Sequence, residues 1–268
     1  MEMQMDYVKG NREAWEEAFD NRSDNWCSGV LAQYRSGELP FIESALAEEL
    51  LKLDLSGKVI GQFCCNNGRE LLSLMKLGAR KGIGFDIAEN QIQCANEFAR
   101  VLGVNCEFIA ANILEIDERY DNSFDLIFIT IGALCWFHDL DLFFEKVSRC
   151  LKSDGTLIIN EAHPVTNMLG LPGEEGFDES NPQRIMHTYF EKTWKENDGM
   201  WYMTGREYAS KTFTSFTHPF SSIVNGIANS GLRIRSLHEY EVDISSEMFS
   251  VLNNTGIPLS YVLRADRP

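Results

Sequence analysis

Positive charge is scarce in this sequence. It contains 24 lysine and arginine residues against 40 aspartate and glutamate residues, a net charge of −16 over 268 residues. A field of this sign repels phosphate backbones, so the composition argues against a nucleic-acid partner. The hydrophobic share of 44% is ordinary for a globular protein, and a chain of this length can bury a large core without metals or disulfides.

Long apolar runs, paired cysteines and clustered histidines are also missing. No apolar stretch reaches membrane-spanning length, and Met1 to Gly10 show no basic segment followed by an apolar one. The seven cysteines form no C-x-x-C pair, and the five histidines do not stand at ligand spacing with cysteine or aspartate. We therefore expect a cytoplasmic protein with reduced cysteines, no membrane association and no metal.

What the sequence does contain is a regular alternation of strands and helices from Lys58 onward. Short apolar runs alternate with segments whose apolar residues recur at helical spacing. The predicted strands cover residues 59–64, 82–87, 104–110, 124–131 and 156–160. This rhythm predicts an α/β fold with a parallel sheet and helices on both of its faces.

Three further segments flank this core, which covers residues 56–163 of what we expect to be a single domain, 1–268. Residues 1–55, the N-terminal cap, read as helices, and residues 164–217, the lid, read as an insertion. In the lid, residues 187–192 and 205–216 look like antiparallel strands, which could also pair between subunits of a homodimer. Residues 218–268 add a helix and a closing antiparallel pair, 232–240 and 259–265, so we expect seven strands in the main sheet.

The first candidate site residues follow the first two strands, because ligands bind beyond the carboxyl ends of parallel strands. Cys64, Asn66 and Gly68 form the turn after the first strand, where glycine permits close approach of a ligand. Asp86, followed by Ile87, ends the second strand 18 residues after Gly68, a position from which a carboxylate can bind both ribose hydroxyls. The alternative for Cys64, Asn66 and Gly68 is an ordinary turn between a strand and a helix. The alternative for Asp86 is the N-cap of the next helix.

Other candidates follow the third, fourth and fifth strands. Asn112 and Ile113 stand where an amide can meet an adenine edge, and Thr130 and Ile131 lead into a segment with Trp136 and Phe137 that can line an apolar pocket. Because histidine titrates near neutral pH, a histidine at the carboxyl edge of the sheet can act as a catalytic base. The sequence therefore offers two candidate catalytic bases, His138 and His163. A structural role suits each of them equally well.

At these residues the chain resembles the class I S-adenosylmethionine-dependent methyltransferases, over about residues 59–160. Within that superfamily it looks closest to a bacterial small-molecule-type group, through Gly132 to Trp136, Glu161 to Pro164, and residues 258–265. It departs from the superfamily pattern, an acidic residue followed by three alternate glycines, because Gln62, Cys64 and Asn66 stand at the first three positions.

The resemblance implies a Rossmann-like fold and S-adenosylmethionine as cofactor, with a methyl group passed to a small molecule. By the same resemblance, Cys64, Asn66, Gly68 and Asp86 would hold the methionine and ribose part of the cofactor, Asn112 and Ile113 would flank adenine, and Thr130 and Ile131 would face the amino-acid end. A binding protein that has lost catalysis is one alternative. A nicotinamide-dependent oxidoreductase is another, but Cys64 and Asn66 spoil the glycine-rich loop that a pyrophosphate requires.

Overall fold

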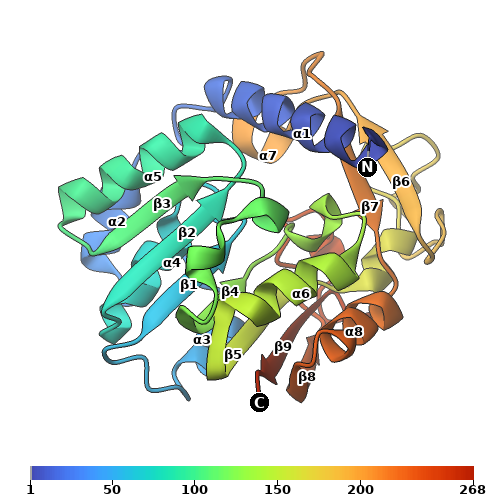
Figure 1. Ribbon diagram of the computed structural model, residues 1–268. Helices are drawn as coiled ribbons and strands as arrows, with labels where there is room; N and C mark the ends of the chain where they lie inside the picture. Colours follow the sequence, from blue (N-terminus) through green and yellow to red (C-terminus); the bar gives the residue numbers. More distant parts are fainter. Residues whose placement is uncertain (1) are drawn as a thin grey trace.

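The computed structural model describes residues 2–268, with the side chains of residues 2–6 outside the description. Its main sheet has seven strands in the order β3-β2-β1-β4-β5-β9-β8 (Figure 1). Five strands are parallel and the last two are antiparallel, as the sequence predicts. The strands are β1 Val59–Phe63, β2 Lys81–Asp86, β3 Cys106–Ala110, β4 Phe124–Ile129, β5 Leu151–Ala162, β8 Arg233–Tyr240 and β9 Ser260–Asp266.

Helices cover both faces of this sheet. On one face lie α2 Val30–Ser36, α3 Ser44–Leu50, α4 Arg69–Leu74 and α5 Glu89–Leu102, and on the other lie α6 Leu140–Cys150 and α8 Phe220–Asn229. Short 3-10 helices interrupt the connections, and these are η1 Met75–Leu77, η2 Ile113–Glu115, η3 Glu118–Tyr120, η4 Leu134–Trp136, η5 Pro164–Met168 and η6 Ser250–Leu252.

The central strand β4 explains the run of four apolar residues from Leu126 to Ile129. Leu126 and Phe128 belong to the core under α3, α4 and α5, whereas Ile127 and Ile129 belong to the core under α6 and α8. Successive side chains of a strand point to opposite faces, so the part that is covered on both sides is apolar at each position, whereas Asp125, near the start of the strand, pairs with Lys152. The strand ends at Ile129, which leaves Thr130 and Ile131 in the following loop rather than in the strand that we predicted.

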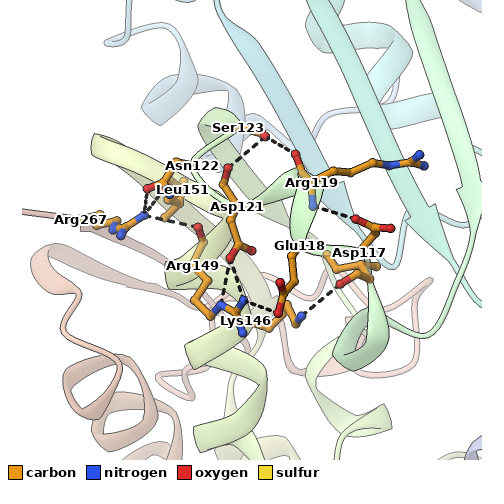
Figure 2. A network of polar contacts seen from close by, with 11 residues as sticks. Asp117, Glu118, Arg119, Asp121, Asn122, Ser123, Lys146, Arg149, Leu151 and Arg267 are labelled. Atoms are coloured by element: carbon orange, nitrogen blue, oxygen red, sulfur yellow. Dashed lines mark hydrogen bonds and ion pairs between the residues drawn. The ribbon is translucent and has the colours of Figure 1, made fainter.

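A polar network fixes the edge of the sheet at which β4 and β5 begin (Figure 2). The guanidinium of Arg149, at the end of α6, lies 2.7 Å from the carboxylate of Asp121, and Arg267 donates to Asn122 Oδ1 at 2.7 Å and to the carbonyl of Leu151. These contacts tie the end of the chain to the start of β5. They lie opposite the carboxyl ends of the parallel strands, where the candidate site residues stand.

The lid contains a separate two-stranded sheet, but its strands differ from the prediction. They are β6 Lys192–Glu196 and β7 Phe213–Thr217, and between them α7 Trp201–Thr204 forms a short helix. The predicted strands 187–192 and 205–216 are therefore wrong in their bounds. Gly205, at φ +68°, ends α7 in the left-handed region and prevents a strand from starting there. None of the helices in residues 2–268 has the length and apolar character needed to cross a membrane.

The N-terminal helix α1 Glu2–Asp20 lies along the lid, next to α7 and β7 (Figure 1). The predicted apolar face is confirmed, because Ala14, Ala18 and Phe19 are buried against the lid residues Met203 and Phe213. In the middle of this helix, Asn11 makes two hydrogen bonds to the backbone of Thr214 on β7. Its Nδ2 donates to the Thr214 carbonyl at 2.8 Å, and its Oδ1 accepts from the Thr214 amide at 2.7 Å.

We predict that Asn11→Ala loosens the attachment of the cap to the lid. The change leaves the buried amide and carbonyl of Thr214 without partners, which we expect to lower the free energy of unfolding by about 2–4 kcal/mol. Urea denaturation measures the loss, and hydrogen exchange at the Thr214 amide should accelerate. The control is Asn105→Ala, which removes an exposed bond to the Arg80 carbonyl and should change stability by less than about 1 kcal/mol. Equal effects of both variants would contradict this role of Asn11.

Candidate functional site

A cavity of about 470 Å³ lies at the carboxyl ends of the parallel strands. Most of its lining comes from the loops after β1 to β4, the end of β5, the helix α1, the lid, and residues 244–246, 248 and 249. Eight of the nine predicted cofactor residues line this cavity. They are Cys64, Asn66, Asp86, Ile87, Asn112, Ile113, Thr130 and Ile131.

The loop after β1 has an unusual backbone. Cys64 has φ +58°, Asn66 has φ +50° and Gly68 has φ +76°, so all three positions at which the resemblance expects glycine adopt the left-handed region. This region costs a residue with a Cβ roughly 1–2 kcal/mol, and asparagine tolerates it better than most. The loop therefore has the backbone conformation that favours glycine, although two of its three glycines are absent.

Asn67, in the same loop, is fully buried and lines the cavity, yet neither its side-chain nitrogen nor its side-chain oxygen has a hydrogen-bond partner among the described residues. Buried amides are nearly always paired in folded proteins. Both atoms are fully buried, so the Asn67 amide belongs to the interior behind the cavity wall and does not face a ligand.

Asp86 connects the loops that follow β1 and β2. Its Oδ2 accepts a hydrogen bond from the Asn66 amide at 2.8 Å, and its Oδ1 accepts one from the Ala88 amide at 3.1 Å, just before α5. Burial raises the pKa of this carboxyl, while the backbone amides of Ala88, Asn66 and Ile87 act in the opposite direction. A carboxylate has about four acceptor positions, so Asp86 can stabilise the loops and still accept hydroxyl groups from a ligand.

Glu70 is a cavity residue that the sequence analysis missed. Its Oε2 accepts hydrogen bonds from Gln62 Nε2 at 2.5 Å and from Thr130 Oγ1 at 2.6 Å. Burial raises the pKa of this carboxyl, and the charge of Arg69 opposes that shift. The acid that the resemblance expects at position 62 is thus replaced by a neighbouring carboxylate, which comes from the following helix and contacts Gln62 directly.

Asn112 and Glu161 have structural duties that limit what they can offer a ligand. Asn112 Oδ1 caps η2 by accepting from the Leu114 amide at 3.2 Å, which leaves its Nδ2 as a donor. Glu161 accepts from the amides of Gly132 at 2.6 Å and Ala133 at 3.0 Å, and so holds the loop after β4 in place. Glu161 also lines the cavity.

The two histidines that we predicted as bases do not line the cavity. His163 uses both ring nitrogens elsewhere: Nε2 lies 2.8 Å from Glu239 Oε1, and Nδ1 accepts from the Val165 amide at 3.1 Å. The ring of His138 packs edge-on against Phe216, with centroids 5.0 Å apart. The structure places a different histidine on the cavity wall, His218, which directly follows β7. No motif or spacing in the sequence singles it out.

Gly68 is the one predicted cofactor residue that does not line the cavity. A Cβ at this position would lie 2.4 Å from the ring of Phe108 and 2.9 Å from Ala95 Cβ. The glycine therefore serves the packing of α4 on β3 and α5 rather than ligand contact.

Of the aromatic residues that we expected to cover the site, Tyr7 and Trp15 do line the cavity, whereas Tyr34 packs beside Lys76, with its ring centroid 4.5 Å from the ammonium nitrogen.

Comparison with known proteins places these features in context. The family model described as "Methyltransferase domain" matches residues 56–210. An uncharacterised protein of Methanocaldococcus jannaschii is 31% identical over 85 residues, which is 31% of this chain and 39% of the relative. The ribosomal protein L11 methyltransferase of Shigella sonnei is 32% identical over 92 residues, 34% of this chain and 31% of that protein. The matches thus span well under half the length of these curated relatives.

Among solved structures, a methyltransferase of Mesorhizobium loti, described as S-adenosylmethionine-dependent, superposes with a TM-score of 0.61. It is 17% identical, and the match covers 87% of this chain and all of that one. At this identity the likeness concerns the fold, and it confirms the Rossmann-like class I methyltransferase architecture that we predicted.

We predict that Gly68→Ala destabilises the fold more than the same change at another left-handed glycine. The new methyl group would overlap the Phe108 ring, which adds about 1–3 kcal/mol of overpacking to about 1–2 kcal/mol of backbone strain. Gly103→Ala is the matched control, since Gly103 also has positive φ but has nothing within 4 Å of the added atom. Urea denaturation compares the two, and equal losses of stability would show that the Phe108 contact does not constrain position 68.

Proposed function

This chain belongs to the methyltransferase domain family, and from that premise we propose that it transfers a methyl group from S-adenosylmethionine to a small molecule. The observation that carries the proposal is the Asp86 carboxylate, which lines the cavity between the loops that follow β1 and β2. A carboxylate in this position can accept hydrogen bonds from the two hydroxyl groups of a ribose.

The charge of the cavity supports a cofactor without phosphate groups. Four carboxylates line it, namely those of Glu70, Asp86, Glu161 and Glu196, and Arg69 supplies the one lysine or arginine side chain among the described lining residues. A dinucleotide would place its diphosphate in this negative field. The nicotinamide alternative therefore fits this cavity poorly, whereas the sulfonium cation of S-adenosylmethionine fits it well.

The amino-acid end of the cofactor has suitable partners next to the β1 loop. We assign its ammonium group to the buried carboxylate of Glu70, which already accepts from Gln62 and Thr130. Its carboxylate group then pairs with Arg69, whose guanidinium packs over the ring of Trp26 at 5.1 Å from the centroid.

The adenine end would lie between Ile87 and Ile113, two apolar lining residues that follow β2 and β3. The free Nδ2 of Asn112 is positioned in the same wall to donate to a ring nitrogen. In this arrangement the ligand crosses the tips of three neighbouring strands, so one side of the cavity binds the cofactor and the lid side remains for the acceptor.

When bound, S-adenosylmethionine supplies a methyl group on a good leaving group, so the protein needs mainly to position the reactants and exclude water. The chain does this with α1 and the lid, which Asn11 and Thr214 join above the cavity. Holding two reactants in a near-attack geometry contributes roughly 7–11 kcal/mol in favourable cases. The same enclosure restricts the acceptor to small molecules.

The seven cysteines are all free, which agrees with action in a reducing compartment. The homodimer that the sequence suggested stays a prediction.

We predict that Asp86→Asn weakens the binding of S-adenosylhomocysteine by roughly 10- to 150-fold, because asparagine keeps one acceptor oxygen and loses one charge-assisted bond to the ribose, worth about 1.5–3 kcal/mol. Isothermal titration measures the dissociation constant. The control is Asp117→Asn, which alters an exposed cap of η3 and should leave the constant unchanged. Absence of binding by the unmodified protein at millimolar ligand would favour a fold that has lost its cofactor.

The same titration has a predicted pH dependence. Protonation removes the charge of Asp86 and turns one of its acceptor oxygens into a donor, and burial raises the pKa of this carboxyl above its ordinary value of 3.8. Binding should therefore be full at neutral pH and weaken as the pH falls through that raised pKa, while the Asp86→Asn variant should lack this step. Circular dichroism at each pH confirms that the protein is folded. Identical pH profiles for both proteins would contradict the assignment of Asp86.

A further inference from the structure

His218 is the histidine that lines the cavity, and it lies in the acceptor half. It directly follows β7, is 7% exposed, and its Nε2 lies 2.8 Å from the backbone carbonyl oxygen of Phe137. A carbonyl oxygen only accepts hydrogen bonds, so Nε2 must carry the hydrogen. This contact fixes both the orientation of the ring and its tautomer.

In that tautomer the other ring nitrogen, Nδ1, has a free lone pair. No side chain or backbone group in residues 7–268 donates to it, in contrast to Nδ1 of His163, which accepts from the Val165 amide. Nδ1 of His218 is not fully buried either, so it is accessible from the cavity that the ring lines. His218 thus presents a basic nitrogen to whatever occupies this half.

The surroundings keep the ring neutral. Burial lowers the pKa of His218, with a smaller contribution of the same sign from His138, while the Phe137 carbonyl and the charge of Glu191 oppose the shift. From α1, Tyr7 faces the same segment, and its own pKa is raised by burial and by the charge of Asp139. At neutral pH the imidazole is therefore unprotonated and able to accept a proton.

Aromatic rings form the walls around His218. Phe216 lies two residues before it and meets the ring of Tyr7 edge-on at 5.0 Å, and Trp136, next to Phe137, meets Trp15 edge-on at 5.3 Å. All four of these side chains line the cavity, and the lining contains no lysine. The one arginine, Arg69, packs over Trp26 and Phe41. A planar, uncharged molecule fits such walls, whereas an anion would find no cation there.

We propose that His218 is the catalytic base and that the acceptor is a neutral aromatic alcohol whose hydroxyl group donates to Nδ1. This inference rests on the proposed methyl transfer. The hydroxyl oxygen uses a lone pair to form the new bond to the methyl carbon, the carbon–sulfur bond breaks with its electron pair staying on sulfur, and the hydroxyl proton moves to Nδ1. The resulting imidazolium then releases that proton to solvent.

The test of the base assignment uses nitrogen NMR of the protein labelled with ¹⁵N-histidine, with His218→Asn to identify the signals. At pH 7 we expect a protonated Nε2 and an unprotonated Nδ1, and we expect the ring to titrate below 6.5, its ordinary pKa. A protonated Nδ1 at pH 7, either in the other tautomer or in an imidazolium, would overturn the proposal.

The test of the acceptor class uses isothermal titration with three probes, 4-methylphenol, benzylamine and phenyl phosphate, in the presence of S-adenosylhomocysteine. We expect 4-methylphenol to bind most tightly and to bind at least tenfold more weakly to His218→Phe, while the exposed His238→Gln variant leaves its affinity unchanged. Tighter binding of the amine or the phosphate, or no binding of 4-methylphenol at millimolar concentration, would overturn the proposed acceptor.

The two failures remain distinguishable, because binding of S-adenosylhomocysteine is measured first and alone. Its loss would remove the proposed function, whereas intact cofactor binding without selectivity for the phenol removes only this inference. With S-adenosylmethionine present, methylation of 4-methylphenol should fall 10²–10⁴-fold in His218→Gln. If the unmodified enzyme binds both molecules and methylates none, His218 is not a base for this acceptor class.

Discussion

The carboxylate of Asp86 is the group on which the cavity most depends. It accepts from the amides of Asn66 and Ala88, and so joins the loop after β1 to the start of α5. The strained backbone of Cys64 and Asn66 is held in place by this contact and by the packing of Gly68 against Phe108. Because parallel strands end at the same edge, one buried carboxylate can hold two loops together and still face a ligand.

The acceptor half of the cavity is built from segments that are distant in sequence. Asn11 and Thr214 are 203 positions apart, and their paired hydrogen bonds attach α1 to the lid. Glu161 organises the loop after β4 through backbone amides, and the Phe137 carbonyl in the next segment orients His218. The loops thus form one wall of the cavity, and the cap and lid supply the other.

The sequence alone predicted the sheet and its antiparallel closing strands, because strand ends and apolar periodicity are local signals. For the same reason, eight of the nine residues proposed for the cofactor line the cavity, while their roles stay predictions. The sequence did not predict Glu70 or His218, since their roles arise from contacts with Gln62, Thr130 and Phe137 that no spacing reveals. It offered His138 and His163 as candidate bases, yet neither lines the cavity, and Glu239 and Val165 engage both ring nitrogens of His163. The lid strands were misplaced for a similar reason, because a wide loop with α7 replaces the predicted tight turn.

A crystal structure with S-adenosylhomocysteine tests the central claim most directly. The account predicts that both ribose hydroxyl groups lie within about 2.5–3.0 Å of the Asp86 carboxylate oxygens, with the adenine between Ile87 and Ile113. A sugar bound far from Asp86, or loops that collapse so that the protein's own side chains fill the cavity, would contradict it.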